Sequence, residues 1–203
     1  MSISINGNGI TSANIADGAI TNADIADVAA SKLTGALPAI DGSNLTGLSG
    51  GLYSSVAIIC DQKAYNATSG TFTSGAWRTR DLNTEISDIG GIVSIASNQF
   101  TLQAGTYTID WSAPVYVAKS HTTRLNNITD GIIQYGTCEY IETSSYSDTR
   151  SFGSAIVTLA SAKVFEIQHR NTNTRTTWGF GQSQNTDATA VSIFTIATIH
   201  KHS

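Results

Sequence analysis

Residues 99–117 read QFTLQAGTYTIDWSAPVYV, and this stretch decides the fold. After a turn at residues 103–106, apolar and polar side chains alternate with a period of two, which is typical of a half-buried antiparallel strand. One face of that strand would carry six residues, namely Tyr107, Ile109, Trp111, Ala113, Val115 and Val117. Pro114 cannot donate a hydrogen bond to a neighbouring strand, so we expect a sheet edge or a bend at that point.

The composition favours a β-rich domain joined to an extended segment. The 203 residues include 18 Gly and 2 Pro, and only 13% are charged. Threonine and isoleucine are abundant and suit pleated surfaces. The net charge is −4 and the 11 Lys and Arg residues form no basic run. Nucleic acid is therefore not an expected partner.

Cysteine usage and hydropathy indicate a protein made in a reducing cytosol. Cys60 and Cys138 could form a disulfide, but two free thiols are the more common arrangement in a chain without a secretory signal. The first residues, MSISINGNG, lack a basic region followed by an apolar stretch. No window approaches 18 consecutive apolar residues, so we expect no membrane insertion.

A repeat precedes the strand-rich part of the chain. Isoleucine recurs every five residues, at Ile5, Ile10, Ile15, Ile20 and Ile25. A fixed period that is neither 3.6 nor 2 indicates stacked units, each burying one side chain. So short a repeat cannot bury these side chains within one chain, so we expect them to pack between several copies, as a trimer interface. The alternative is a disordered, weakly hydrophobic tail.

A segment rich in Gly and Ser, with one Pro, separates this repeat from the strand-rich part of the chain. We assign residues 1–36 to the repeat segment, residues 37–51 to a Gly/Ser-rich linker and residues 52–203 to a C-terminal domain. Strands are predicted at regular spacing in this domain. They include a first strand with Val56, Ile58 and Cys60 on one face, and strands over residues 91–96, 122–128, 131–141, 155–159, 164–169 and 190–199. Asp130-Gly131 is a strong hairpin signal between two of them.

The last predicted strand is apolar on both faces. Phe194 and Ile196 lie on one face, and Val191, Ile193 and Ile199 lie on the other. A strand of this kind should be covered on both sides. We therefore expect Phe194 and Ile196 to contact a neighbouring subunit.

Loop lengths predict where the chain ends lie. Short turns occur near Gly105, Gly131 and Ala162, whereas the connections over residues 61–76, 118–121, 143–150 and 171–188 are mostly longer. Alternate connections of an antiparallel sandwich lie at the same end. Both ends of the domain should therefore lie with the short turns, and the long loops should be distal to the N-terminal segment.

Several ordered segments resemble a known family. Residues 99–117, TTRLNNITDG at 122–131, SFGSAIVTLASAKVFEIQHR at 151–170 and AVSIFTIATIHK at 190–201 resemble the heads of complement first-component subunits and their tumour-necrosis-factor-like relatives. With GFG at 179–181, they are similar to the C-terminal domain of bacteriophage tail-fibre proteins. The resemblance covers about residues 80–200. It implies an all-β, ten-strand jelly-roll sandwich that forms a homotrimer on a shaft whose N-terminus attaches to a tail or capsid protein.

No motif for catalysis is present, so we expect no enzyme and no cofactor. The carboxylate pairs Glu139/Glu142 and Glu85/Asp88 are interpreted as solvated. His200-Lys-His202 has metal-ligand spacing, but it follows the last predicted strand, where a frayed tail is the expected structure. His169 is interpreted as a structural histidine. No metal site is therefore predicted.

Binding is assigned to the distal loops. Their aromatic, charged and imidazole side chains could stack on and hydrogen-bond to a surface glycan. The candidate receptor-binding residues are Lys119, His121, Tyr146, Asp148, Arg150, Arg175 and Trp178. Packing of Trp178 back onto the domain is the alternative interpretation for that residue.

Three functions fit these features. The first is a virion fibre that binds a host cell-surface receptor, a saccharide or a protein, without cleaving it. The second is a head-decoration or baseplate fibre with a docking and trimerisation role alone. The third is a complement-head signalling module, against which the missing signal peptide argues. Adsorption of the protein to host cells separates the first function from the second.

Overall fold

The structure is a computed structural model that describes residues 16, 51–131, 133–183 and 186–203. The chain divides into two units, Met1–Leu48 and Ser49–Ser203. The five repeated isoleucines and nearly all of the predicted linker lie outside the described residues. The fold below is that of residues 51–203, called the body.

Strands account for all the regular structure of the described residues. They are β1 (Tyr53–Lys63), β2 (Arg78–Thr79), β3 (Thr84–Ile89), β4 (Val93–Ala96), β5 (Gln99–Leu102), β6 (Gly105–Tyr116), β7 (Lys119–Asn127), β8 (Ile133–Ile141), β9 (Asp148–Leu159), β10 (Lys163–Asn171) and β11 (Ser192–His202). No helix capable of crossing a membrane occurs in the described part of the chain.

The strand pairs are nested along the chain. β1 pairs with β11, β5 with β10, β6 with β9, and β7 with β8. Each pair lies within the previous one in sequence, as in a long hairpin that has been rolled up, and this connectivity is that of a jelly roll. The first sheet has the order β3-β1-β11-β6-β9 and the second sheet has the order β4-β5-β10-β7-β8. The prediction of an all-β jelly-roll sandwich is confirmed.

Two details differ from the expected strand list. Besides the ten strands of the two sheets there is β2, which has two residues and pairs with β10. The strands on either side of the short turn near Ala162, β9 and β10, belong to different sheets. That turn therefore crosses from one layer to the other.

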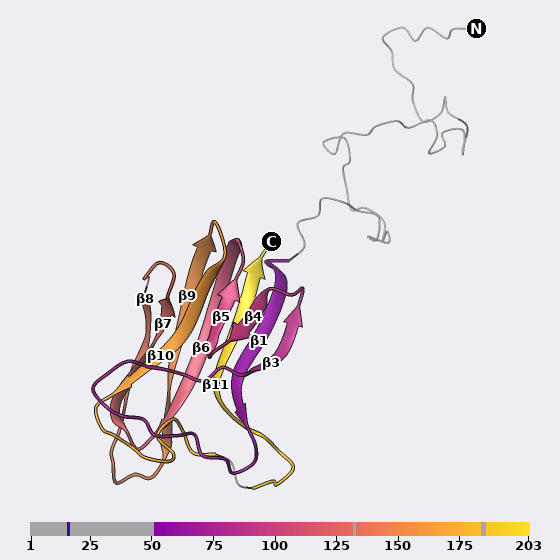
Figure 1. Cartoon of the computed structure of the whole chain (residues 1–203). Coiled ribbons are helices and arrows are strands. Elements are labelled where there is room, and N and C mark those ends of the chain that lie inside the picture. The colour runs from indigo at the N-terminus through magenta and orange to yellow at the C-terminus, as the bar shows by residue number, and fades with distance from the viewer. Residues whose placement is uncertain (1–15, 17–50, 132, 184–185) are drawn as a thin grey trace, which may run out of the picture. The chain divides into compact units, whose positions relative to one another are not determined.

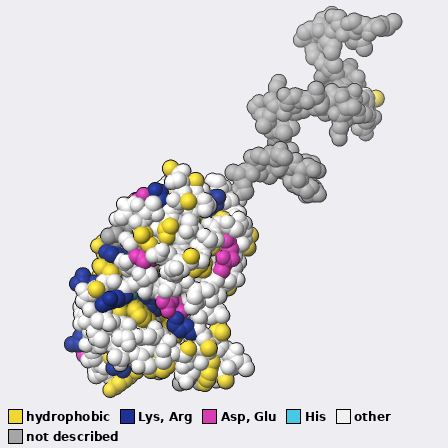
Figure 2. All heavy atoms as spheres, in the orientation of Figure 1, with side chains coloured by type: hydrophobic (Ala, Val, Ile, Leu, Met, Phe, Trp, Pro, Cys, Tyr) yellow, Lys and Arg dark blue, Asp and Glu magenta, His cyan; other side chains and the backbone are white. Residues whose placement is uncertain are grey.

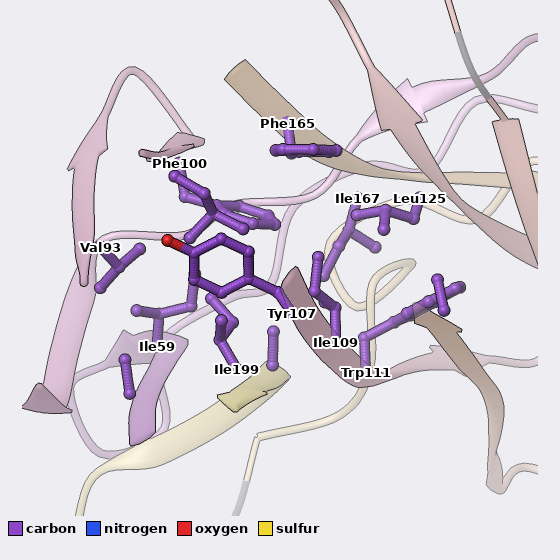
Figure 3. Packing of buried hydrophobic residues seen from close by; sticks show 14 of the residues in the cluster. Ile59, Val93, Phe100, Tyr107, Ile109, Trp111, Leu125, Phe165, Ile167 and Ile199 are labelled. Atoms are coloured by element: carbon purple, nitrogen blue, oxygen red, sulfur yellow. The ribbon is translucent and has the colours of Figure 1, made fainter. Parts of the chain in front are cut away.

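The core lies between the two sheets. Tyr107 and Ile109 from β6 face Phe165 and Ile167 from β10, and Trp111 continues the same row (Figure 3). These side chains are buried because they occupy alternate positions on strands whose inner faces pack together. Burial of aromatic and branched side chains on this scale is the main stabilising term of such a sandwich.

The alternation of Val56, Ile58 and Cys60 does not mark the buried face of β1. Ala57 and Ile59 are fully buried, whereas Val56 and Ile58 are only partly covered and lie on the opposite face. Cys60 is also buried, because β1 has irregular register near this position against both β3 and β11. A bulge inserts an extra residue, so simple alternation does not identify the inward face.

Pro114 lies at a local edge, as expected. β6 pairs with β11 only as far as Ser112, whereas it pairs with β9 along its whole length. The missing N–H of Pro114 therefore falls beyond the last β11 pair. From residue 112 to residue 118 both faces of the chain are buried, so the alternation of Tyr107 to Trp111 ends there.

The two ends of the body differ as the loop lengths predicted. Tyr53 pairs with His202, and Gly105 pairs with Leu159, so the chain termini of the body lie with the short turns. At the other end Tyr116 pairs with Asp148, and Asn171 pairs with His121. Figure 1 shows the long connections gathered at that end, which we call the distal end.

Candidate functional site

Three of the predicted distal residues are exposed. Tyr146 is 71% exposed, and Lys119 at the start of β7 and Asp148 at the start of β9 are also exposed. Tyr146 and Lys119 have positive φ, 46° and 58°, which places them at tight bends of the chain.

Several charged distal residues hold the loops together. The Nη2 atom of Arg150 donates to the carbonyl of Phe194 at 2.6 Å and to Ser112 Oγ at 2.9 Å. Asp148 accepts the backbone N–H of Gln182 at 3.0 Å. The guanidinium of Arg175 lies 5.0 Å from the ring centroid of Tyr116. These contacts are structural.

The Trp178 segment packs onto the body. Trp178 forms an isolated bridge with Gly70, and the neighbouring Gly179 donates its N–H to the carbonyl of Gly70 at 2.9 Å. The side chain of Trp178 is partly buried. Its position agrees with the packing alternative more closely than with a free aromatic surface.

His121 lies inside the body. Its Nδ1 atom is 3.0 Å from Nε2 of His169 and its Nε2 atom is 2.8 Å from Oγ1 of Thr149. Burial, followed by the charge of Arg80, lowers the pKa of His121 from 6.5 to about 4. The same causes lower the pKa of His169 well below its ordinary value. A neutral imidazole that is only 3% exposed and hydrogen-bonded at both nitrogens stabilises the fold.

Arg80 lies at the centre of the distal end, although no sequence motif identified it. Its guanidinium is completely buried and donates to Thr195 Oγ1 at 2.7 Å, to the carbonyl of Pro114 at 3.1 Å and to that of Phe180 at 2.9 Å. Burial lowers its pKa to about 9. One side chain thus joins β11, β6 and the Phe180 loop, and it stacks on the Phe180 ring at 4.6 Å.

The two predicted interface residues of β11, Phe194 and Ile196, differ in exposure. Phe194 is 2% exposed and lies under Pro114 and the chain at Gly181, so it has no surface for another subunit. The expectation for Phe194 is therefore wrong, because its own distal loop covers it. Ile196 is partly exposed on the outer face of the first sheet.

That outer face of the first sheet carries rows of residues across all its strands. One row runs from Ile89 through Val56, His200 and Thr108 to Ile156. A parallel row places Ile196 beside Ser112 and Phe152. A shallow hollow of about 520 Å³ lies over this second row.

The His200-Lys201-His202 segment is not a frayed tail. It forms the end of β11, paired with β1 on one side and with β6 on the other. His202 Nε2 is 2.8 Å from Thr108 Oγ1, and the Tyr53 ring contacts both imidazoles. The expectation failed because the strand continues past the last apolar residue. Among the described residues, no three His, Cys, Asp or Glu side chains are grouped as metal ligands.

The remaining candidate groups lie apart from one another. Cys60 is buried and Cys138 is exposed, and both are free thiols. Glu142 accepts the hydroxyl of Tyr140 at 2.6 Å, which lowers the pKa of this carboxyl group. The carboxylate of Asp88 accepts the N–H groups of Ile92 and Val93 at 2.8 and 3.1 Å.

A further surface, on the outer face of the second sheet, was not predicted. A hollow of about 340 Å³ lies near its distal end, and its lining residues are Ser120, His121, Thr122, Cys138, Glu139, Tyr140, Arg170, Asn171 and Thr172. On the same face, Tyr135, Arg124, Gln168 and Thr79 form one row across β8, β7, β10 and β2.

Trp77 folds over this row. The guanidinium carbon of Arg124 is 4.2 Å from the Trp77 ring centroid, and the rings of Trp77 and Tyr135 are 6.0 Å apart at 50°. We call Trp77, Arg124 and Tyr135 the aromatic platform. Its members are separated in sequence and only the strand order brings them together, so no local motif could have found them.

On the face drawn in Figure 2, charged side chains of both signs are interspersed.

Comparisons with known proteins give distant structural likenesses only. No protein-family model and no curated protein matches the chain. Solved structures similar to it include the globular domain of zebrafish complement 1qA protein, with 14% identity, 73% of this chain and 95% of that chain covered, and a TM-score of 0.45. Murine APRIL at pH 5.0 has 8% identity, covers 72% and 98%, and has a TM-score of 0.48.

Vertex protein P5 of PRD1 is also similar, with 8% identity, 74% of this chain and 99% of that chain covered, and a TM-score of 0.43. All these scores are below 0.5, so the likenesses carry no conclusion about the ligands or partners of this chain.

Proposed function

We propose that this chain is a structural protein of a bacteriophage virion, a homotrimeric tail fibre whose jelly-roll head binds a host surface component without cleaving it. The ordered segments between residues 99 and 201 that resemble tail-fibre heads support this function. The body begins at residue 51, and this start lies at the end opposite the long loops, as a head on a shaft requires. The N-terminal segment would attach to a tail or capsid protein.

The proposal of self-association rests on the exposed apolar residues of the first sheet's outer face. Ile89, Phe152 and Ile156 are exposed there to 64%, 53% and 70%. Large apolar side chains exposed together on one face of a protein often mark a protein–protein interface. Three copies packed through this face about one axis would cover it, as in closed cyclic oligomers. Ile196 then becomes an interface residue.

Receptor binding would use surfaces that such a trimer leaves open. Lys119 and Tyr146 at the distal end, and the hollow on the second sheet, lie away from the outer face of the first sheet. Three sites on one fibre raise the effective affinity of a weak ligand without new contacts. The proposed ligand is a saccharide of the bacterial surface.

Two measurements on the full chain test this function. The solution mass should be about 64 kDa, three times the 21.3 kDa of the chain. The purified protein should also adsorb to host cells and compete with virions. A monomer would contradict the fibre. A trimer that neither adsorbs nor competes would instead favour the alternative, a head-decoration or baseplate fibre with a docking role.

A further inference from the structure

We propose that the aromatic platform binds an acidic saccharide, with the sugar ring against Trp77 and Tyr135 and the sugar carboxylate on the guanidinium of Arg124. This inference rests on the proposed function, since it names the chemical class of surface component that the head would bind. It places the site on the side of the head, on the outer face of the second sheet.

The first argument is that Arg124 is held in place before any ligand binds. Its Nε atom donates to Gln168 Oε1 at 2.7 Å, and the amide of Gln168 donates in turn to Glu166. Glu166 is 6% exposed and also accepts Asn126 Nδ2 at 3.0 Å and Thr79 Oγ1 at 2.8 Å. A guanidinium fixed by such a network loses little conformational entropy when it binds.

The second argument is that Arg124 keeps two unused donors. Neither of its Nη atoms has a hydrogen-bond or ion-pair partner among the described residues. Together they form a planar fork that matches a carboxylate in two parallel hydrogen bonds. The face of the guanidinium is covered by Trp77 at 4.2 Å, so the open direction for a ligand is the edge that carries these donors.

The third argument is charge. The carboxylate of this network, that of Glu166, is buried and already accepts hydrogen bonds from three neutral donors. Arg170 lies two residues from Gln168 on the same face of β10 and is exposed, whereas Arg78 pairs with His169 and belongs to the other face of β2. Arg124 and Arg170 thus bring two arginines to one face of a chain whose net charge is −4. Their charge favours an anionic ligand.

The aromatic rings identify the ligand as a sugar. Tyr135 is 64% exposed beside Trp77, which gives the anion site an apolar wall. An isolated phosphate or carboxylate would leave that wall unused, whereas the C–H face of a pyranose packs on aromatic rings. The hollow farther along the same face supplies hydroxyl groups for neighbouring sugar units, including those of Ser120 and Thr122.

Titration of the full chain with defined oligosaccharides tests the site. The probes are trigalacturonic acid and a hyaluronan tetrasaccharide, each compared with its methyl ester by isothermal titration calorimetry. At least one acid should bind about tenfold or more tightly than its ester, because a charge-assisted fork is lost on esterification. Arg124→Gln should remove this preference, and Arg124→Lys should keep only part of it.

Further variants separate the two parts of the platform. Trp77→Ala should weaken acid and ester alike by about tenfold, because it removes the stacking surface. Lys163→Gln, which removes a positive charge at the short-turn end, is the matched control and should leave the affinities unchanged. Circular dichroism and urea unfolding of each variant check that the fold is retained.

The outcomes decide the inference independently of the proposed function. Equal affinity for both acids and their esters would overturn the site, and so would an acid preference that survives in Arg124→Gln. Adsorption of the wild-type chain to host cells is scored separately. Arg124-dependent binding of an acid by a chain that does not adsorb would retain the site and remove the receptor role.

Discussion

Gly153 shows how one missing side chain shapes the core. It lies opposite Trp111 in the β6–β9 pairing, and a Cβ atom built at this position would be 2.0 Å from Cζ2 of Trp111. The indole cannot move aside easily, because its Nε1 atom donates to Thr123 Oγ1 at 2.8 Å. The indole therefore occupies the space that a side chain on β9 would need.

We expect Gly153→Ala to lower the free energy of unfolding by about 1–3 kcal/mol, the usual cost of overpacking a core. Urea denaturation followed by tryptophan fluorescence measures this change. Gly51→Ala is the matched control, because a Cβ atom at that position meets nothing within 4 Å. Equal stability of both variants would show that Trp111 can shift.

At the scale of elements, two buried histidines join three strands. His169 of β10 and His121 of β7 are hydrogen-bonded at 3.0 Å, and His121 reaches Thr149 of β9 at 2.8 Å. β9 belongs to the first sheet and the other two strands belong to the second. The pair thus closes the distal end of the sandwich, provided that both imidazoles stay neutral.

This arrangement predicts a loss of stability in mild acid. In the folded state the pKa of His121 is about 4, below its ordinary 6.5, so the unfolded chain binds the proton first as the pH falls. Stability is therefore fully present above pH 6.5 and declines between pH 6.5 and about 4. From pH 7 to pH 5 the contribution of His121 to this loss is about 2 kcal/mol.

Comparison with His121→Gln isolates that contribution. Urea denaturation at pH 7 and pH 5 should show a smaller loss in the variant than in the wild type, by about 2 kcal/mol. Carboxyl groups such as that of Asp61 titrate in both proteins, so their effects cancel in the comparison. The same pH dependence in both proteins would contradict a neutral, buried His121.

How much the sequence can predict also depends on the element. The alternation from Tyr107 to Trp111 identified the inward face of β6, because one face of that stretch is covered and the other is open. It failed on β1, where a bulge changes the register, and on β11, where Phe194 is covered by a loop. A pattern within one strand contains no information about such neighbours.

The candidate site was harder to predict than the fold. Loop lengths located the distal end, but most of the charged residues chosen there hold the loops together, as Arg150 does through Phe194 and Ser112. The aromatic platform depends on the order β2-β10-β7-β8, which places Trp77, Arg124 and Tyr135 side by side. That order follows from the rolled-up topology and not from any local spacing.

At the scale of the whole molecule, the two sheets have outer faces of different chemistry. The first presents Ile89, Phe152 and Ile156, and the second presents a hydrogen-bonded network around Glu166 and Gln168. Apolar surface is best removed from water by another copy, whereas a polar network with free arginine donors is suited to a soluble ligand. We therefore propose that assembly and recognition use opposite sides of the sandwich.

Ile156→Lys tests this division of roles. Ile156 is 70% exposed in the body, so a lysine at this position costs the folded monomer little, but it would place a charge in the proposed subunit interface. We expect the mass measured by analytical ultracentrifugation to fall from about 64 kDa toward the 21.3 kDa of one chain. Ile128→Lys, at the β7–β8 turn, is the control and should leave the mass unchanged. A trimer that tolerates Ile156→Lys would mean that the subunits meet elsewhere, and the apolar face of the first sheet would then need another partner.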